Sequence, residues 1–189
     1  MTDETAGDGD EPPGPFPVPP LSFEDAEGHD ISVRPLFAAD DADVEALVEM
    51  YVDFDPSMRA QGIPPTGESR VRDWLETLVD GDDGYNVVAW DGDDAVGHAT
   101  LVPDGDAGYE LAIFVHQDYQ GCGIGTRLIR TLLGYGAENG VGDVWLTVER
   151  WNHAAVALYE KVGFETTNAE SFELEMAMHL AEAQTESTG

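Results

Sequence analysis

Residues Gln120-Gly121-Cys122-Gly123-Ile124-Gly125-Thr126 decide the fold of this chain. An apolar run at 111–115 comes shortly before them and is typical of a buried strand. After them, apolar side chains recur at helical spacing from Ile124 to Ala137. Glycine permits positive φ and lets the main chain approach a ligand closely. Because the first N–H groups of a helix attract anions, this strand, turn and helix predict a phosphate or pyrophosphate site.

The spacing of the glycines separates this loop from two other phosphate-binding loops. A P-loop ends in Gly-Lys-Ser/Thr, whereas Gly125 is followed by Thr126 and Arg127. A dinucleotide-binding loop has G-x-G-x-x-G near the start of a βαβ unit. The glycines of this chain have neither that spacing nor that position, so a nucleotide-binding redox domain is disfavoured. The spacing that fits is Gln-x-x-Gly-x-Gly, at Gln120, Gly123 and Gly125.

This loop resembles the acyl-CoA loop of the GNAT superfamily of N-acetyltransferases. A second stretch, NHAAVALYEKVGF from Asn152 to Phe164, is similar to the segment that closes the GNAT core. The resemblance is close over residues 85–178 and covers 31–84 in outline. It implies an acyltransferase that moves an acetyl group from acetyl-CoA to an amine by direct transfer in a ternary complex. The alternative is a non-catalytic acyl-CoA-binding sensor on the same fold.

The pattern of apolar residues by itself predicts a mixed α/β domain. Strands are expected at 31–36, 85–90, 95–102, 110–115, 144–148, 164–167 and 172–178, with helices between several of them. The resemblance adds a single central mixed sheet of about seven strands with helices on both faces. It also implies that the fourth and fifth strands splay apart to admit the pantetheine arm of CoA.

A chain of 189 residues is most simply one domain with tails. Residues 1–28 are acidic and rich in proline, so we expect a disordered tail there. The acyltransferase domain is expected over 29–180, and a frayed C-terminal tail over 181–189.

Acidic residues number 39 against 8 Lys and Arg, a formal net charge of −31. Such a surface repels nucleic acid and anionic membranes, so we expect neither as a partner. The composition resembles that of proteins from salt-in halophiles. No basic segment followed by an apolar run is visible at the N-terminus, and no apolar stretch is long enough to span a bilayer. A cytoplasmic location is therefore expected.

The resemblance implies donor binding by the end of the fourth strand, the glycine loop and the start of the last helix. Arg127 and Arg130 share a helix face near the loop, and each is either a partner for a CoA phosphate or a surface arginine paired with a carboxylate. Asn152 could cap its helix, contact the pantetheine region, or do both. The expected donor-binding residues are Phe114, Val115, Gln120, Gly121, Cys122, Gly123, Ile124, Gly125, Thr126, Arg127 and Asn152.

The resemblance nominates Tyr159 as the general acid for the leaving thiolate; the alternative is a core tyrosine on an amphipathic helix. Glu110 is the candidate base for the amine, and Glu149 is its competitor; the alternative for each is a surface acid in a chain that has many. His116 has a suitable pKa for a base but is expected to be structural. Cys122 lies in the pyrophosphate loop, away from the thioester, so a covalent intermediate is disfavoured. No metal is expected.

The acceptor is expected to be a small-molecule or protein amine, and its identity is not written in the sequence. The resemblance places acceptor recognition in 53–68 and 167–172, where Arg59, Asp53 and Asp55 could hold a charged group. Many proteins of the superfamily are dimers, so a homodimer stays open.

Overall fold

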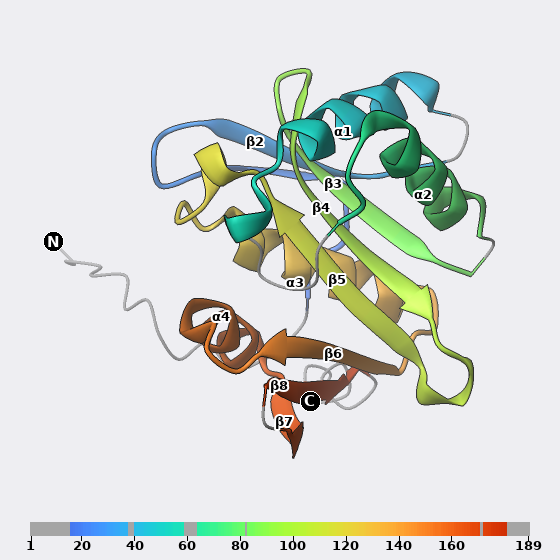
Figure 1. Ribbon diagram of the computed structural model, residues 1–189, viewed down its shortest axis with the longest axis vertical. Helices are drawn as coiled ribbons and strands as arrows, with labels where there is room; N and C mark the ends of the chain where they lie inside the picture. The colour runs from blue at the N-terminus through green and yellow to red at the C-terminus, as the bar shows by residue number, and fades with distance from the viewer. Residues whose placement is uncertain (1–15, 38–39, 59–63, 82, 171, 181–189) are drawn as a thin grey trace, which may run out of the picture.

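The computed structural model describes residues 16–37, 40–58, 64–81, 83–170 and 172–180, in which eight strands form one mixed sheet (Figure 1). The strand order is β1-β2-β3-β4-β5-β6-β8-β7. The strands are β1 (Leu21–Glu24), β2 (Asp30–Pro35), β3 (Tyr85–Asp91), β4 (Asp94–Pro103), β5 (Tyr109–Val115), β6 (Asp143–Glu149), β7 (Glu165–Ala169) and β8 (Glu173–His179). The α-helices are α1 (Asp41–Asp53), α2 (Glu68–Asp80), α3 (Ile124–Glu138) and α4 (His153–Val162). Short 3₁₀ turns are η1 (Pro56–Met58), η2 (Gly105–Ala107) and η3 (Gln117–Tyr119).

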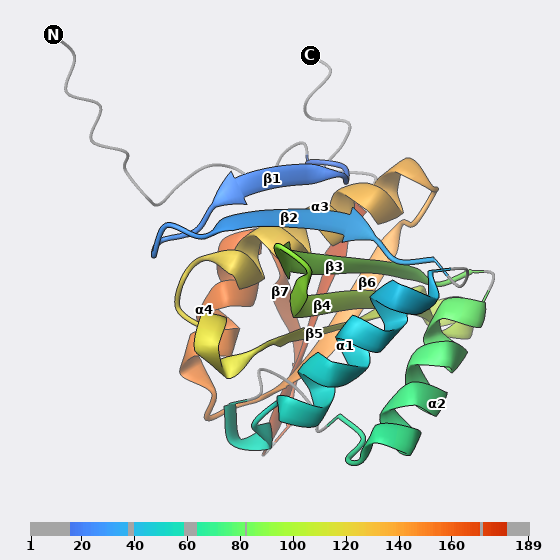
Figure 2. The ribbon, with the colours of Figure 1, turned by 90° about the horizontal axis from the view of Figure 1, so that it is seen from above.

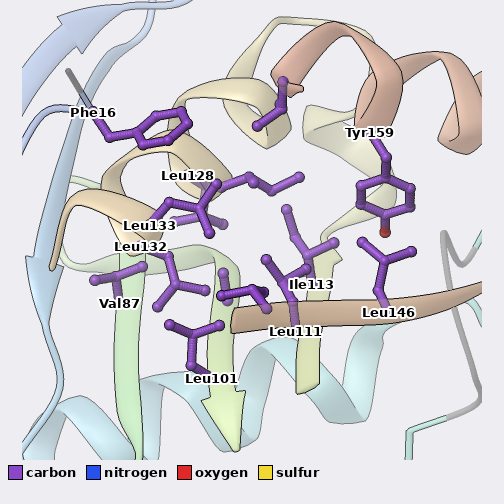
Figure 3. Packing of buried hydrophobic residues seen from close by; sticks show 14 of the residues in the cluster. Phe16, Val87, Leu101, Leu111, Ile113, Leu128, Leu132, Leu133, Leu146 and Tyr159 are labelled. Atoms are coloured by element: carbon purple, nitrogen blue, oxygen red, sulfur yellow. The ribbon is translucent and has the colours of Figure 1, made fainter. Parts of the chain in front are cut away.

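Helices cover both faces of the sheet, as expected, with α1 and α2 on one side (Figure 2). Strand side chains alternate between the two faces, so Ile113 joins the core beneath α3 and α4 while Phe114 joins the core beneath α1 and α2. In the first core, Leu128, Leu132 and Leu133 of α3 pack on the sheet (Figure 3). None of the described helices is both long and apolar enough to cross a membrane.

Strands β5 and β6 run parallel but soon diverge (Figure 1). Their register covers two residue pairs, Tyr109 with Val144 and Glu110 with Trp145. On its other edge β5 pairs with β4 over its whole length. The expected splay between the fourth and fifth strands of the GNAT core is therefore present, between β5 and β6.

The ordered domain begins earlier than the expected boundary at residue 29, which is a correction to that boundary. The sheet has one strand more than the seven expected, and this extra strand is β1, which pairs with β2 at the edge of the sheet. Ahead of β1, Phe16 is buried against α3, and a Cβ at Gly134 of α3 would overlap the Pro17 carbonyl. Burial of these few apolar groups overrides the disorder expected from the acidic composition. Residues 1–15 and 181–189 lie outside the described part of the chain.

Candidate functional site

A pocket of about 370 Å³ lies where β5 and β6 separate, between the N-terminal end of α3 and one face of α4. Residues of β5 and α4 supply an apolar slot, and the glycine loop closes one end of it. The lining residues are Ile113, Val115, Tyr119, Gln120, Gly121, Gly123, Gly125, Thr126, Asn152, Ala154, Ala155 and Leu158.

The glycine loop presents bare backbone at the start of α3. Gly123 is the N-cap residue of α3 and has φ of 88°, a left-handed conformation that other residues rarely adopt. A Cβ at Gly125 would lie 3.8 Å from Leu158 and Val115, inside the slot. The Gln120 side chain donates through Nε2 to the Val115 carbonyl at 2.9 Å and so holds the loop to the end of β5. Open backbone and a helix N-terminus together are features that favour an anion.

Asn152 caps α4, as one of its two expected roles requires, and its contact with the pantetheine region stays a prediction. Its Oδ1 accepts a hydrogen bond from the Ala155 N–H at 3.2 Å, which caps α4, and the residue also lines the pocket. The pocket thus lies beside the starts of both α3 and α4.

Seven of the expected donor-binding residues line the pocket, and four do not. The side chains of Phe114 and Ile124 are buried in the cores on the two faces of the sheet. Strand alternation explains why the Phe114 side chain is turned away from the pocket, since its neighbours Ile113 and Val115 both line the pocket. Any contribution of Phe114 or Ile124 to ligand binding is limited to its main chain.

Cys122 is buried outside the pocket, beneath the turn between β1 and β2. Its carbonyl accepts a hydrogen bond from the Ala26 N–H at 3.1 Å. Burial raises the pKa of the Cys122 thiol, and the carboxylates of Glu27 and Asp25 raise it further. A thiol with a raised pKa is less ionised and therefore less reactive, and the absence of a covalent intermediate on Cys122 stays a prediction.

Arg127 and Arg130 do not line the pocket, and neither alternative from the sequence describes them fully. The Arg127 guanidinium lies 5.0 Å from the centre of the Phe23 ring, and that of Arg130 lies 5.4 Å from the Phe16 ring. Both arginines therefore make cation–π contacts with the N-terminal segment. Those contacts were unforeseen because the segment was expected to be disordered.

Tyr119 is a lining residue that the motif did not reveal, although it directly precedes Gln120. Its hydroxyl donates a hydrogen bond to Asp91 at 2.7 Å. This hydrogen bond, with burial and nearby acids, raises the pKa of Tyr119 to about 12. Tyr119 is therefore held protonated, with its hydroxyl engaged away from the glycine loop.

Tyr159 lies on α4, next to the lining residue Leu158, and is fully buried. Its hydroxyl points toward Leu146 of β6 (Figure 3) and has no hydrogen-bond partner in the described part of the chain. Burial raises its pKa above the usual value for tyrosine. A buried hydroxyl without a partner is uncommon, and Tyr159 itself is not among the residues that line the pocket.

The two candidate bases lie at opposite ends of the splay. Glu110 stands near the start of β5, where partial burial and Asp104 raise its pKa. Strands rise about 3.3 Å per residue, so Glu110 lies roughly 10 Å along β5 from the lining residue Ile113. Glu149 ends β6, and its carbonyl accepts a hydrogen bond from the Asn152 N–H at 3.0 Å. The structure therefore brings Glu149 close to the pocket and leaves Glu110 at the far end.

His116 is held on both ring nitrogens. Nδ1 accepts from the Asp118 N–H at 3.2 Å, which leaves the proton on Nε2, and Nε2 donates to Asp53 at 2.7 Å. The ring is largely buried and both of its nitrogens are engaged, so a structural role stays the prediction for His116. Of the other acceptor-side candidates, Asp55 is exposed in the segment after α1. Arg59 lies outside the described residues.

Residues 44–164 match the model of the acetyltransferase (GNAT) family. The chain is 42% identical over 84 residues to a mycothiol acetyltransferase from Geodermatophilus obscurus, which covers 41% of this chain and 27% of that protein. It is 52% identical over 58 residues to the N-alpha-acetyltransferase RimI of Mycobacterium tuberculosis, covering 30% of this chain and 35% of the relative. The chain thus spans about a third or less of the curated relatives it matches.

Solved structures show the same fold at low sequence identity. The GNAT domain of S. lividans PAT superposes with a TM-score of 0.71 at 17% identity, over 85% of this chain and 96% of that one. The structure of yncA from Salmonella typhimurium with its cofactor acetyl-CoA gives a TM-score of 0.65 at 20% identity, over 79% of this chain and 94% of that one.

Proposed function

The chain belongs to the acetyltransferase (GNAT) family, and we propose that it moves an acetyl group from acetyl-CoA to an amine by direct transfer in a ternary complex. The observation that carries the proposal is the pocket at the splay of β5 and β6, closed by a glycine loop at the start of α3. A thioester donor with a phosphorylated tail matches this combination of an apolar slot and an anion site.

The residues of the pocket divide between the two ends of the donor. The backbone N–H groups of the loop and of the first turn of α3 would hold the pyrophosphate. The slot between Ile113 and Val115 on β5 and Leu158 on α4 would hold the pantetheine arm. Because the slot is lined by residues of both β5 and α4, the arm would run between β5 and α4.

Transfer needs a neutral amine, a polarised thioester carbonyl and a proton for the leaving thiolate. Tyr159 would supply that proton, since burial keeps its hydroxyl protonated and no other described group binds it. For the amine, Glu149 is better placed than Glu110 because it ends β6 beside Asn152. A small-molecule or protein amine remains the proposed acceptor class.

Calorimetry with CoA and with acetyl-CoA in molar potassium chloride tests the donor site. We expect binding of both ligands by the folded protein, followed by release of CoA thiol in the presence of some members of a panel of amines. Absence of binding would overturn the proposal. Binding without thiol release across polyamines, amino acids, lysine and N-terminal peptides would favour the non-catalytic acyl-CoA sensor instead.

A further inference from the structure

The segment that follows α1 and the segment that follows β5 are joined by side chains of His116 and Gln117. Gln117 donates through Nε2 to the Asp53 carbonyl at 2.7 Å and accepts through Oε1 from the Asp55 N–H at 2.9 Å. His116 adds its Nε2 bond to the Asp53 carboxylate at 2.7 Å. These three hydrogen bonds connect segments more than 60 residues apart in the chain. They are called here the interloop contact, which consists of Asp53, Asp55, His116 and Gln117.

One side of the interloop contact leads directly into the donor pocket. Gln117 begins the η3 turn, which ends at the lining residue Tyr119 and continues into Gln120. The Gln120 side chain donates a hydrogen bond to the Val115 carbonyl, so the start of the glycine loop is held to the end of β5. Movement of the glycine loop on ligand binding would therefore reach Gln117 through a short, hydrogen-bonded turn.

The Asp53 side of the interloop contact leads to the face of the sheet that α1 and α2 cover. Asp53 ends α1, and the next residue, Phe54, packs edge-on against Phe114 with ring centres 5.9 Å apart. Phe114 lies between Ile113 and Val115, whose side chains face the pocket. If the donor occupies the pocket on one face, as in the proposed function on which this inference rests, the exposed Asp53 and Asp55 offer the amine an approach to the same strand end from the other face.

We propose that Gln117 and His116 are positioning residues that couple occupation of the donor pocket to the order of the acceptor-side segment at 53–58. Donor binding immobilises the glycine loop and, through η3, the Gln117 amide that holds the Asp55 N–H. Coupling between two sites is a shared free energy, so order in one segment favours order in the other. The acceptor side would then be assembled after the donor is in place.

Hydrogen exchange of the full chain with and without CoA, in molar potassium chloride, measures this coupling without any knowledge of the acceptor. In the wild-type protein we expect CoA to slow amide exchange in both 120–126 and 53–58, the latter by about 5-fold or more, at the low end of typical coupling strengths. Gln117→Met removes two of the three hydrogen bonds with little change of volume. In this variant the slowing at 53–58 should disappear while the slowing at 120–126 persists.

Two further variants separate the parts of the contact. Asp53→Ala removes the bond to His116 and keeps the backbone bonds to Gln117, so the slowing at 53–58 should be reduced and not abolished. Asn139→Ala is the matched control, because it removes one side-chain hydrogen bond, to the Tyr135 carbonyl, at the other end of α3. It should behave as the wild type.

Thermodynamic linkage supplies an internal check. The Kd for CoA in Gln117→Met should rise by no more than the factor by which CoA slows exchange at 53–58 in the wild type. The inference is overturned if CoA protects 120–126 alone in the wild type, or if Gln117→Met keeps the protection at 53–58. It is also overturned if the Kd rises far beyond the linked factor, which would make Gln117 part of the donor site. Absence of any protection by CoA would instead refute the proposed function.

Discussion

Tyr159 combines full burial with a hydroxyl that has no partner in the described residues. A buried polar group without a hydrogen bond destabilises the folded state, so a purely structural role would be served better by phenylalanine. The catalytic and the structural interpretations of this tyrosine therefore predict different outcomes for one substitution.

Tyr159→Phe should lower turnover about 100-fold or more, because general acid catalysis typically contributes that much. CoA affinity should stay near that of the wild type, since only a proton donor is lost. The melting temperature should be unchanged or higher, because the removed hydroxyl has no partner to lose. Thiol-release kinetics, calorimetry and thermal unfolding measure the three quantities. Unchanged turnover across the pH range would make Tyr159 a core residue only.

Gly125 offers a cleaner probe of the pocket than Gly123. Gly123 has a positive φ, so any larger residue there strains the loop, whereas an added Cβ at Gly125 has room and points into the slot. Gly125→Val should weaken CoA binding roughly 10- to 100-fold, because overfilling a packed site typically costs about 1–3 kcal/mol. Calorimetry measures the loss, and circular dichroism should show an intact fold.

The control for this variant is Gly81→Val, which also replaces an unstrained glycine but at the end of α2, outside the pocket lining. It should bind CoA as the wild type does. Equal affinities of Gly125→Val and the wild type would remove the slot from the donor site.

Among the elements, a buried hydrogen-bonded chain ties α1 and α2 to the sheet. Tyr51 of α1 donates to His98 Nδ1 at 2.6 Å, and His98 Nε2 donates to Asn86 of β3 at 2.9 Å. Asn86 in turn donates to the Leu78 carbonyl of α2. Both ring nitrogens are used in the neutral form, and burial lowers the pKa of His98 to about 3.

This depressed pKa predicts an acid-sensitive element of stability. In the unfolded chain His98 has its ordinary pKa of about 6.5 and takes up a proton that the folded protein excludes. Its contribution is therefore complete above about pH 6.5 and falls, by up to about 1.4 kcal/mol per pH unit, as the pH drops toward 3. Denaturant unfolding in molar salt at several pH values measures the slope.

The comparison that isolates His98 is the His98→Gln variant, which should be less stable at neutral pH but show a shallower loss in acid. The wild-type slope also contains the carboxylates, so the difference between the two proteins is the informative quantity. If the free energy of unfolding fell equally with pH in the two proteins, His98 would not be a cause of the loss of stability in acid.

For the whole molecule, the dominant physical quantity is the net charge of −31. Several of the few cationic side chains are already engaged: Arg72 pairs with Glu45 and Glu68, and Arg127 and Arg130 lie over aromatic rings. They cannot offset repulsion among the many remaining carboxylates. Self-repulsion of this kind destabilises the compact state and opposes an anionic ligand such as CoA.

Folding and acetyl-CoA turnover should therefore rise together from dilute buffer to molar potassium chloride. The screening length falls from about 30 Å at 0.01 M ionic strength to about 3 Å at 1 M, so repulsion across the domain becomes repulsion between nearest neighbours. Far-ultraviolet circular dichroism and thiol release against salt concentration test this. A protein fully folded and most active in dilute buffer would contradict the halophilic interpretation.

The local motifs were predictable because their physics is local. Gln120 to Thr126 needs glycines for its backbone and a following helix for its charge, and Asn152 to Phe164 carries its own cap, apolar face and terminal Gly163. Each signal lies within about a dozen residues. The strand–turn–helix unit, the splayed GNAT sheet and the place of the pocket all follow from these segments and their order.

Other features depended on contacts between distant parts of the chain. Strand alternation turned Phe114 away from the pocket, the parallel register of β5 and β6 put Glu149 near it and Glu110 far from it, and burial of Phe16 added β1 to the sheet edge. The hydrogen bonds of Gln117 to Asp53 and Asp55 have no sequence signal at all. Short-range preferences determine which elements form, whereas only the packing of those elements decides which side chains meet.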